Sequence, residues 1–484
     1  MPAERYFLET MGCQMNVLDS ELVAGQLRAL GFEPASQMDE ADLVLLNTCS
    51  VRGHAEEKVY SRLGELRKLK RRRPDMIIGV IGCMAERDAD GLLARGSHVD
   101  LLCGPNQIAR IPALIEQARA CRVRRDRGGP PIALSHAHSR AVAPEARSLT
   151  LDALEGLDLS RPVREDGAPQ AYVRVQRGCD KFCSFCVVPF TRGPEVSRPP
   201  ANIVAEVRRL ADAGVKEVTL LGQTVNSYRY QEDGRVVRFA ELLERVHEVP
   251  GIARLRFVTS YPGDFTEDIL EAMRDLPKVC EYLHIPAQSG SDAVLARMKR
   301  QYTVGHYLDL VERARAIVPD IALAGDFIVG FSGETAAEFE QTAALLERVR
   351  YKNCFIFRYS PRPGTAADRR LPDDVPTDVK QARNTRLLEI QDRVSREDNQ
   401  RLIGRVVEVL VEGFSKAAIR AQEAEQTRGQ EVDWRRSDQL TGRTRGDQIV
   451  VFAGDPSRIG EFANVRIASA TALTLHGEAV EGKS

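Results

Sequence analysis

Three cysteines lie within eight residues of one another, at Cys179, Cys183 and Cys186, directly after the apolar run Ala171 to Val175. Three thiolates this close in sequence can hold three irons of a [4Fe–4S] cube. The fourth iron then has no protein ligand, so a small molecule can bind there. The C-x3-C-x2-C spacing therefore predicts an iron–sulfur cluster with one open coordination position.

A zinc site or a group of ordinary buried thiols is the alternative interpretation. Structural zinc sites close with a fourth Cys or His nearby, whereas the nearest histidines, His138 and His247, are remote in sequence. Three cysteines so close together are also an unusual way to fill an apolar core. The soft thiolate ligands and their spacing favour the cluster.

A second set of three cysteines is spread over the N-terminal third. Cys13, Cys49 and Cys83 each follow an apolar run that predicts a strand, and each comes after a glycine or a threonine. The carboxyl ends of parallel strands line one crevice, where ligands bind. We therefore hypothesise a second cluster with three protein ligands, although any one of these cysteines alone is more simply a buried thiol. The other four cysteines are assigned to packing: Cys103, Cys121, Cys280 and Cys354.

The elements that must position these cysteines alternate between apolar runs and helical periodicity. From Arg5 to about Ala120 this alternation predicts a small parallel α/β domain. Its predicted strands cover residues 6–11, 42–46 and 76–81. The first helix is expected to be capped by Asp19 or Ser20 and to end at Gly31.

The middle of the chain repeats the strand and helix pattern six times, which predicts an incomplete (β/α)6 barrel. Its predicted strands cover residues 171–175, 217–221, 255–259, 282–285, 321–329 and 354–359. Binding residues of such barrels sit at the carboxyl ends of the strands, where the first cysteine set already lies.

From Arg405 the pattern changes to short β runs at 406–411, 449–452 and 465–468, which predict a small all-β barrel. Five of its basic residues are expected to donate to phosphates: Lys416, Arg420, Arg443, Arg445 and Arg458. The polar stretch 417–439 is interpreted as a surface loop or insertion.

Composition favours a soluble globular protein, with 43% hydrophobic and 28% charged residues in a chain of 484. The net charge of −1 means that any nucleic-acid binding must come from local basic patches. One predicted helix and its end carry such a patch, which is either a solvated face or a contact for RNA phosphates: Arg62, Arg67, Lys68, Lys70, Arg71, Arg72 and Arg73. With no signal-like N-terminus and no apolar run of spanning length, we expect a cytoplasmic protein without a membrane partner.

Several of these segments resemble the methylthiotransferase family of radical S-adenosylmethionine (SAM) enzymes, over nearly the full chain. The segments that carry the resemblance are Gly12–Asn16, Asn47–Arg52, Cys186–Gly193, Leu221–Tyr228, Thr259–Phe265 and Leu440–Arg445. They are most similar to the branch that acts on N6-isopentenyladenosine in tRNA. The resemblance implies an N-terminal methylthiotransferase domain over 4–121, a linker over 122–167, a radical SAM core over 168–397 and a TRAM-like RNA-binding domain over 400–478.

The resemblance also implies two [4Fe–4S] clusters, one that cleaves SAM on Cys179, Cys183 and Cys186 and an auxiliary one on the N-terminal set. The implied reaction adds a methylthio group to C2 of N6-isopentenyladenosine at position 37, in the anticodon loop of tRNA. Gln288, Ser289, Asp326 and Gly330 lie in segments that resemble SAM-binding elements. An external electron donor and a monomeric chain are expected; the sulfur donor is not identified, and no catalytic acid or base is assigned.

Three other functions remain open at this point. The nearest are methylthiotransferases that act on threonylcarbamoyladenosine in tRNA or on an aspartate of a ribosomal protein. The third is a non-catalytic iron–sulfur protein that binds RNA. The chain also departs from the family pattern at Pro194-Glu195, at Ser332, at Ala287 and in the 417–439 stretch, but none of these positions is a predicted cluster ligand.

Overall fold

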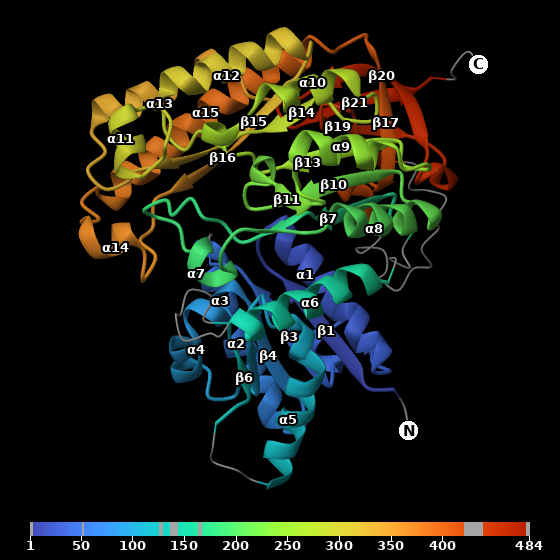
Figure 1. Cartoon of the computed structure of the whole chain (residues 1–484), viewed down its shortest axis with the longest axis vertical. Coiled ribbons are helices and arrows are strands. Elements are labelled where there is room, and N and C mark those ends of the chain that lie inside the picture. The colour runs from blue at the N-terminus through green and yellow to red at the C-terminus, as the bar shows by residue number, and fades with distance from the viewer. Residues whose placement is uncertain are drawn as a thin grey trace. The chain divides into compact units, whose positions relative to one another are not determined.

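The structure, a computed structural model, describes residues 3–50, 53–124, 129–135, 144–162, 167–420 and 439–480. Its residues form two compact units, which can be followed by colour in Figure 1. The first unit holds the described residues up to Pro162 together with Arg174–Arg198 and Leu221–Gln223, and the second holds the rest. The segment with Cys179, Cys183 and Cys186 therefore belongs to the same unit as the N-terminal cysteines.

The first unit is built on a parallel sheet in the order β2-β1-β3-β4-β5-β6. Its strands are β1 (Arg5–Thr10), β2 (Glu33–Pro34), β3 (Leu43–Thr48), β4 (Ile77–Gly82), β5 (Leu101–Cys103) and β6 (Ile132–Ala133). The side chains of β3 alternate between two apolar cores, with Leu43 and Leu45 in one and Val44 and Leu46 in the other. Burial on both faces explains why these strands read as continuous apolar runs.

Helices cover this sheet: α1 (Gln14–Ala29), α2 (Gly53–Arg72), α3 (Cys83–Arg87), α4 (Ala89–Arg95), α5 (Ile111–Arg124) and α6 (Pro144–Ser160). The predicted cap of the first helix was wrong, because α1 begins at Gln14 and Cys13 occupies its N-cap position. Asp19 and Ser20 lie inside the helix and are buried. The Asp19 carboxylate pairs with arginines instead of capping backbone N–H groups.

The prediction of an extended linker over 122–167 was also wrong over much of its length. Strand β6 extends the sheet, with Cys103 opposite Ala133. Helix α6 buries Leu154 in the core of the first unit. Residues 125–128, 136–143 and 163–166 lie outside the described part of the chain.

The six predicted barrel strands lie in the second unit, except for the last residues of β7 and β10. They are β7 (Gln170–Arg174), β10 (Glu217–Leu221), β13 (Arg254–Val258), β14 (Tyr282–His284), β15 (Ala322–Val329) and β16 (Asn353–Arg358). They form the orders β13-β10-β7 and β14-β15-β16. A parallel bridge from Leu255 to Val279 joins the two groups. The predicted incomplete (β/α)6 barrel is therefore confirmed.

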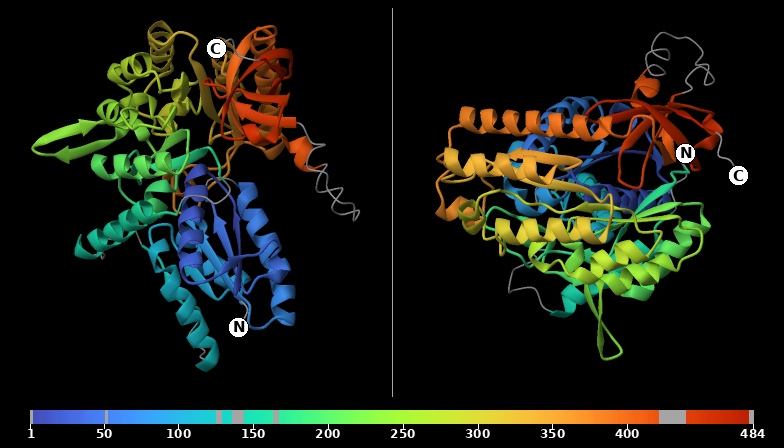
Figure 2. Two further views of the ribbon diagram at one scale, coloured as in Figure 1. Left: turned by 90° about the vertical axis from the view of Figure 1, so that its right-hand side faces the viewer. Right: turned by 90° about the horizontal axis from the view of Figure 1, so that it is seen from above.

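Helices of the barrel lie outside its strands, and Figures 1 and 2 show α12, α13 and α15 along one side of β14–β16. The helices are α8 (Pro200–Asp212), α9 (Phe239–His247), α10 (Glu267–Asp275), α11 (Asp292–Arg297), α12 (Val304–Ile317), α13 (Ala336–Val349), α14 (Ala366–Arg370) and α15 (Thr377–Gln400). A short hairpin, β11 (Arg229–Glu232) with β12 (Arg235–Arg238), follows β10. None of the described helices is both long and apolar enough to cross a membrane.

The C-terminal part is a closed barrel in the order β17-β18-β19-β21-β20, as predicted. Its strands are β17 (Val406–Phe414), β18 (Gln439–Arg443), β19 (Ile449–Ala453), β20 (Phe462–Ala470) and β21 (Thr474–Ala479). The sequence did not indicate β18 and β21, whose glycines, Gly442 and Gly477, interrupt the apolar pattern. Most of the predicted insertion, residues 421–438, lies outside the described part.

Candidate functional site

The N-terminal cysteines follow three strands that are neighbours in the sheet, β1, β3 and β4. Cys13 occupies the N-cap position of α1, Cys49 comes directly after β3, and Cys83 is the first residue of α3. Cys49 and Cys83 are 1% and 6% exposed, and Cys13 is partly buried. The topology thus brings residues 36 and 34 positions apart to one edge of the sheet, as the sequence predicted.

Contacts show that these thiols share one space. A Cβ added at Gly12 would lie 2.6 Å from Cys49 Cβ and 3.2 Å from its Sγ, so only glycine fits beside Cys49. A hydrogen bond from the Cys49 thiol lowers the pKa of Cys13 to about 5. Burial raises the pKa of Cys83, and the positive charge of Arg192 opposes that rise.

The donor set suits an iron–sulfur cluster. Thiolates are the ligands of such clusters, and a lowered thiol pKa favours the thiolate. Across the described residues, no three side chains of His, Cys, Asp or Glu surround a single point as they would a lone metal ion. A cube presents its irons at separate corners, so its ligands need to face one space, not one point.

Two asparagines from the segments that carry the family resemblance, Asn16 and Asn47, hold the loops with Cys13 and Cys49. Asn16 Nδ2 donates to the carbonyl oxygens of Met11 (3.1 Å) and Thr48 (3.0 Å). Asn47 Nδ2 donates to the carbonyl oxygen of Asn16 (2.8 Å) and to Ser20 Oγ (2.9 Å). The two strand ends are therefore cross-linked by buried side-chain amides, which need such partners to be buried at low cost.

The second cysteine set lies in a loop, residues 178–193, which we call the Cys loop. Its ends are paired by two short antiparallel strands, β8 (Gln176–Arg177) and β9 (Val196–Ser197). Gly178 has φ +71°, and an added Cβ would collide with the carbonyl oxygens of Gly193 and Pro194. This close approach permits only glycine and closes the base of the loop.

Two backbone hydrogen bonds shape the Cys loop. Cys179 N donates to Gly193 O at 3.1 Å, and Cys186 N donates to Cys183 O at 3.1 Å. Cys179 and Cys183 are each 9% exposed, and burial raises the pKa of Cys179 to about 11. A cluster bound here would replace those thiol protons, because its ligands are thiolates.

Arg192 connects the Cys loop to the N-terminal cysteines. It ends α7 (Val188–Arg192) and donates through Nη2 to Asn16 Oδ1 (2.9 Å) and Asp19 Oδ2 (2.8 Å). Burial would raise the pKa of Asp19, but Arg192 and Arg174 hold it below its usual value. Asn16 and Arg192 belong to segments that carry the family resemblance, but the sequence did not predict that their side chains are in contact.

Further buried ion pairs fix both ends of the Cys loop to the first unit. Arg174 pairs with Asp19 at 2.8 Å and with Asp158 at 3.1 Å. Asp158 also accepts a hydrogen bond from Arg177, and Arg198 pairs with Glu155 at 2.8 Å. Because α6 supplies both Glu155 and Asp158, the segment predicted as a linker helps to position the loop.

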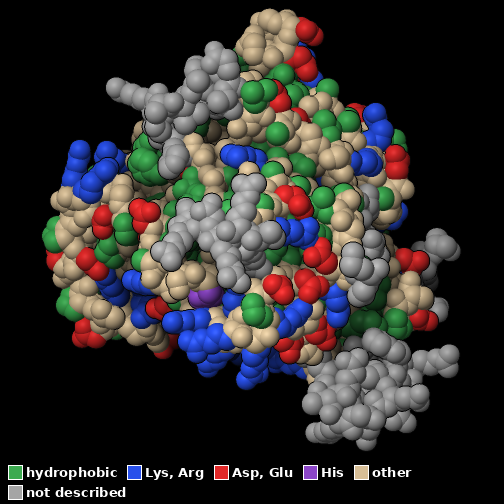
Figure 3. Space-filling view, turned by 90° about the horizontal axis from the view of Figure 1, so that it is seen from below, with side chains coloured by type: hydrophobic (Ala, Val, Ile, Leu, Met, Phe, Trp, Pro, Cys, Tyr) green, Lys and Arg blue, Asp and Glu red, His purple; other side chains and the backbone are tan. Residues whose placement is uncertain are grey.

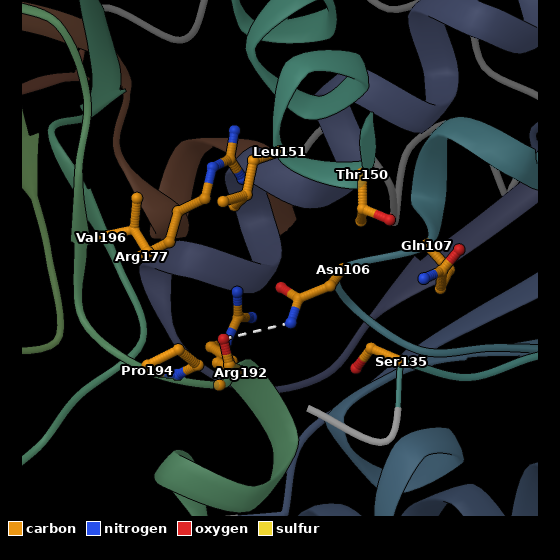
Figure 4. Close-up of a pocket in the computed structure, with 10 residues that line it drawn as sticks. Asn106, Gln107, Ser135, Thr150, Leu151, Arg177, Arg192, Pro194 and Val196 are labelled. Carbon is orange, nitrogen blue, oxygen red and sulfur yellow. Dashed lines mark hydrogen bonds between the residues drawn. The ribbon is translucent and has the colours of Figure 1, made fainter. Parts of the chain in front are cut away.

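A pocket lies beside the base of the Cys loop (Figure 4). It is lined by residues from the loops after β5 and β6, from α6 and from both ends of the Cys loop: Asn106, Gln107, Ser135, Thr150, Leu151, Arg177, Arg192, Gly193, Pro194 and Val196. Asn106 points toward α7 and donates through Nδ2 to the carbonyl oxygen of Arg192 at 3.1 Å. This contact fixes the end of α7 against the sheet.

The four predicted SAM-binding residues lie in the second unit, at the carboxyl end of β15 and in the segment beside it. Gln288 has φ +69° and pairs with β15, its N donating to Asp326 O at 2.8 Å. Ser289 is buried, with Oγ 3.2 Å from Thr342 Oγ1. Gly330 N donates to Glu334 Oε2 at 2.6 Å. The side chain of Ser289 therefore has a structural partner, and the side chain of Asp326 stays partly exposed on the strand.

His284 was missed by the sequence analysis. Its Nε2 lies 3.2 Å from Asp326 Oδ1, and its Nδ1 accepts a hydrogen bond from Thr259 N at 3.3 Å. These contacts assign the ring proton to Nε2, as a donor to Asp326. A histidine at the end of a predicted strand next to a strand-end aspartate was the only signal in the sequence.

Comparison with known proteins decides the family. Residues 5–104 match the uncharacterized protein family UPF0004, 173–346 the radical SAM superfamily and 430–480 the TRAM domain. The chain is 47% identical over 471 residues to the tRNA-2-methylthio-N(6)-dimethylallyladenosine synthase of Rhodopirellula baltica, covering 97% of this chain and 94% of that protein. It is 42% identical over 481 residues to the synthase of that name from Neisseria gonorrhoeae, covering 99% and 100%. The chain belongs to this family.

Membership in the synthase family makes the chain a radical SAM enzyme, and enzymes of that superfamily use SAM and a [4Fe–4S] cluster. A solved structure shares the fold: the radical SAM methyltransferase TsrM of Kitasatospora setae, with cobalamin and a [4Fe-4S] cluster bound. Its TM-score is 0.52 at 15% identity, covering 76% of this chain and 74% of that one. The methylthiotransferase resemblance predicted from the motifs is confirmed.

Several basic residues of this chain form internal ion pairs. Two of the predicted phosphate donors have internal partners: Arg443 pairs with Asp447 at 2.7 Å and Arg445 with Glu281 at 2.7 Å. Their contact with phosphates stays a prediction. Arg256 Nη1 donates to the carbonyl oxygen of Arg445 at 2.7 Å. The contacts of Arg445 with Glu281 and of Arg256 with Arg445 fasten the TRAM barrel to the region of β13 and β14.

Four of the seven cations predicted along one helix and at its end are exposed, all on α2: Arg67, Lys68, Arg71 and Arg72. The others are paired, Arg62 with Glu9 (2.9 Å), Arg73 with Asp42 (2.6 Å) and Lys70 with Asp100. A group of Lys and Arg side chains is also visible on the face seen in Figure 3. Exposed cations on consecutive helical turns suit a phosphate backbone.

Proposed function

We propose that this chain adds a methylthio group to C2 of N6-isopentenyladenosine at position 37 of tRNA. The observation that carries the proposal is its similarity, over the full length, to proteins that bear this activity in their name. The matching TRAM region supports an RNA substrate. Base 37 lies in the anticodon loop, and loop bases can be turned into a pocket at low cost.

Cys179, Cys183 and Cys186 would hold the [4Fe–4S] cluster of the radical SAM reaction. When bound, that cluster supplies the electron that generates a radical able to attack an unactivated aromatic C–H. The chain itself holds the three thiols in one loop, through the close approach at Gly178 and the ion pairs of Arg174 and Arg177. The side chains of Asp326 and Gln288 are proposed to contact SAM, together with the backbone near Ser289 and Gly330.

Cys13, Cys49 and Cys83 would hold a second [4Fe–4S] cluster. Their positions at three adjacent strand ends support this proposal, as does the glycine that lets Cys49 approach Cys13. Arg192 brings a positive charge into the same space, which would balance part of the negative charge of a cluster with three thiolates. We infer that the electron donor is external and that the chain acts as a monomer.

We propose the domain limits that the sequence predicts: 4–121 for the N-terminal domain, 122–167 for the linker, 168–397 for the radical SAM core and 400–478 for the TRAM-like domain. The Cys loop would thus belong to the core in sequence while packing on the N-terminal unit.

The test is a reaction with reconstituted protein, SAM, a reductant, sulfide and tRNA that carries N6-isopentenyladenosine. Mass spectrometry of the digested tRNA should show 2-methylthio-N6-isopentenyladenosine, and 5′-deoxyadenosine should be released. The same reaction with tRNA bearing threonylcarbamoyladenosine should leave that nucleoside unchanged. A protein with its full iron content that releases no 5′-deoxyadenosine would exclude the proposed activity.

A further inference from the structure

Strands β15 and β16 expose a group of side chains on the face that points away from the helices. Phe327 and Val329 are fully buried, and the Phe327 ring packs edge-on against Tyr351, whose carbonyl oxygen accepts a hydrogen bond from Gln391 of α15. Because side chains alternate along a strand, Asp326 and Ile328 point to the opposite face. The parallel register places Asp326 beside Phe355 and Ile328 beside Phe357. These four side chains therefore share the inner face of the barrel.

Phe355 is unusual on this face because 43% of it is exposed. Eleven other large apolar side chains among the described residues are similarly exposed. They lie in the first unit, on the β11–β12 hairpin, on α15 or beyond it; none is on a strand of the six-stranded barrel. An exposed aromatic surface on the inner face of a barrel is a feature of binding sites, since exposed apolar surface favours a ligand that removes it from water.

The two rings form a continuous apolar surface. Their centroids are 6.5 Å apart and their planes differ by 13°. The His284 ring meets Phe355 edge-on, with centroids 6.5 Å apart. His284 Nε2 and Asp326 Oδ1 form a hydrogen bond of 3.2 Å. The polar edge of this apolar surface is therefore fixed and carries one carboxylate.

We propose that Phe355 and Phe357 bind the N6-dimethylallyl group of the substrate adenosine and so select prenylated RNA; this inference rests on the function proposed above. The dimethylallyl group is five carbons of apolar surface, and it alone distinguishes this base from an unmodified adenosine. Two near-parallel rings offer that group more apolar contact than a single ring would. The carboxylate of Asp326 at the edge also disfavours the carboxylate of a threonylcarbamoyl group, which gives selectivity by repulsion.

The test compares two anticodon stem-loops that differ only in the dimethylallyl group, with the reconstituted full chain. Wild type should bind the prenylated RNA at least about tenfold more tightly, as expected for apolar selectivity of more than one methylene. Phe355→Ala should lose most of this preference, and Phe355→Trp should keep it. Leu388→Ala, at a 48% exposed position on α15, is the matched control and should change nothing.

SAM cleavage measured without RNA shows whether the rings bind the substrate or SAM. The test is needed because the adenine of SAM is also able to stack on these rings. Phe355→Ala should release 5′-deoxyadenosine at the wild-type rate when RNA is absent. Loss of that release would mean that the rings bind SAM, and an unchanged preference for prenylated RNA would equally overturn the inference. If Phe355→Ala lowers the iron content, Phe357→Ala is judged by the same measurements. Wild type that forms no methylthio product would contradict the proposed function instead, whatever the variants do.

Discussion

At the scale of residues, the candidate cluster sites depend on positions where no other side chain fits. Gly12 lets Cys49 approach Cys13, and Gly178 lets the ends of the Cys loop meet. The sequence shows the motifs around these glycines. Only the fold shows that no larger residue fits at either position. Arg192 shows what the sequence does not reveal, because its partners Asn16 and Asp19 are more than 170 residues away in sequence. Such pairs cannot be found from spacing or periodicity.

Gly178→Ala should lower the iron bound by the Cys loop without affecting the N-terminal site. The added Cβ would collide with the backbone of Gly193 and Pro194, and φ +71° disfavours any residue with a Cβ. Iron content should fall by about half if each site holds one four-iron cluster, and 5′-deoxyadenosine release should be lost. Gly64→Ala, on α2 with no atom within 4 Å of the new Cβ, should match wild type in both measurements. Normal SAM cleavage by Gly178→Ala would contradict the closure described for the loop.

At the scale of elements, apolar runs and helical periodicity predicted the buried strands of both units. They failed for α6, which was included in a polar linker although its sequence holds five leucines, among them the buried Leu154. Ion pairs also hold this helix in place. The sequence patterns also failed for the start of α1, because an aspartate inside the helix resembled a cap. In both cases a charged side chain has a distant partner that local sequence does not reveal. The short strands β18 and β21 were missed because glycine weakens the signal of a strand.

Asp158 on α6 gives a prediction for pH. Burial would raise its pKa, but Arg174, Arg177 and Arg198 hold it far below its usual value. A carboxyl whose pKa is lowered on folding contributes stability above its unfolded pKa, about 4, and loses it as pH falls toward the folded pKa. Asp158→Asn should therefore cost about 3–5 kcal/mol. The midpoint of thermal unfolding of this variant should lie below that of wild type by a constant amount from pH 8 to pH 5. The difference should shrink only below about pH 4.

The control for this prediction is Asp275→Asn, which removes an exposed pair with Arg274 and should shift the midpoint little. Limited proteolysis of the Cys loop should accelerate in Asp158→Asn and not in Asp275→Asn. A deficit that already disappears near pH 6 would show that the buried arginines do not hold the carboxylate ionised.

At the scale of the whole molecule, a net charge of −1 leaves RNA binding to local patches. The TRAM barrel was expected to supply such a patch, yet Arg443 and Arg445 pair with acids of the chain itself. Composition could locate basic residues but could not tell which of them have internal partners. The exposed cations of α2 remain available for the RNA backbone.

Charge reversal on α2 tests whether these cations contact phosphates. The variant with Arg67, Lys68, Arg71 and Arg72 changed to Glu should bind tRNA more weakly. The slope of log K against log salt concentration should fall by about 1 for each lost phosphate contact. Arg348→Glu with Arg396→Glu, exposed on α13 and α15, is the control and should leave the slope unchanged. An unaltered slope in the α2 variant would assign these cations to a solvated surface.

The most direct test of two cluster sites is the iron and sulfide content of wild type and of two triple variants, reconstituted side by side without oxygen. One variant replaces Cys13, Cys49 and Cys83 by Ala, and the other replaces Cys179, Cys183 and Cys186. Wild type should hold about eight irons per chain and each variant about four, with 5′-deoxyadenosine release kept only when the Cys loop is intact. If the variant without Cys13, Cys49 and Cys83 holds as much iron as wild type, those three thiols do not bind a cluster.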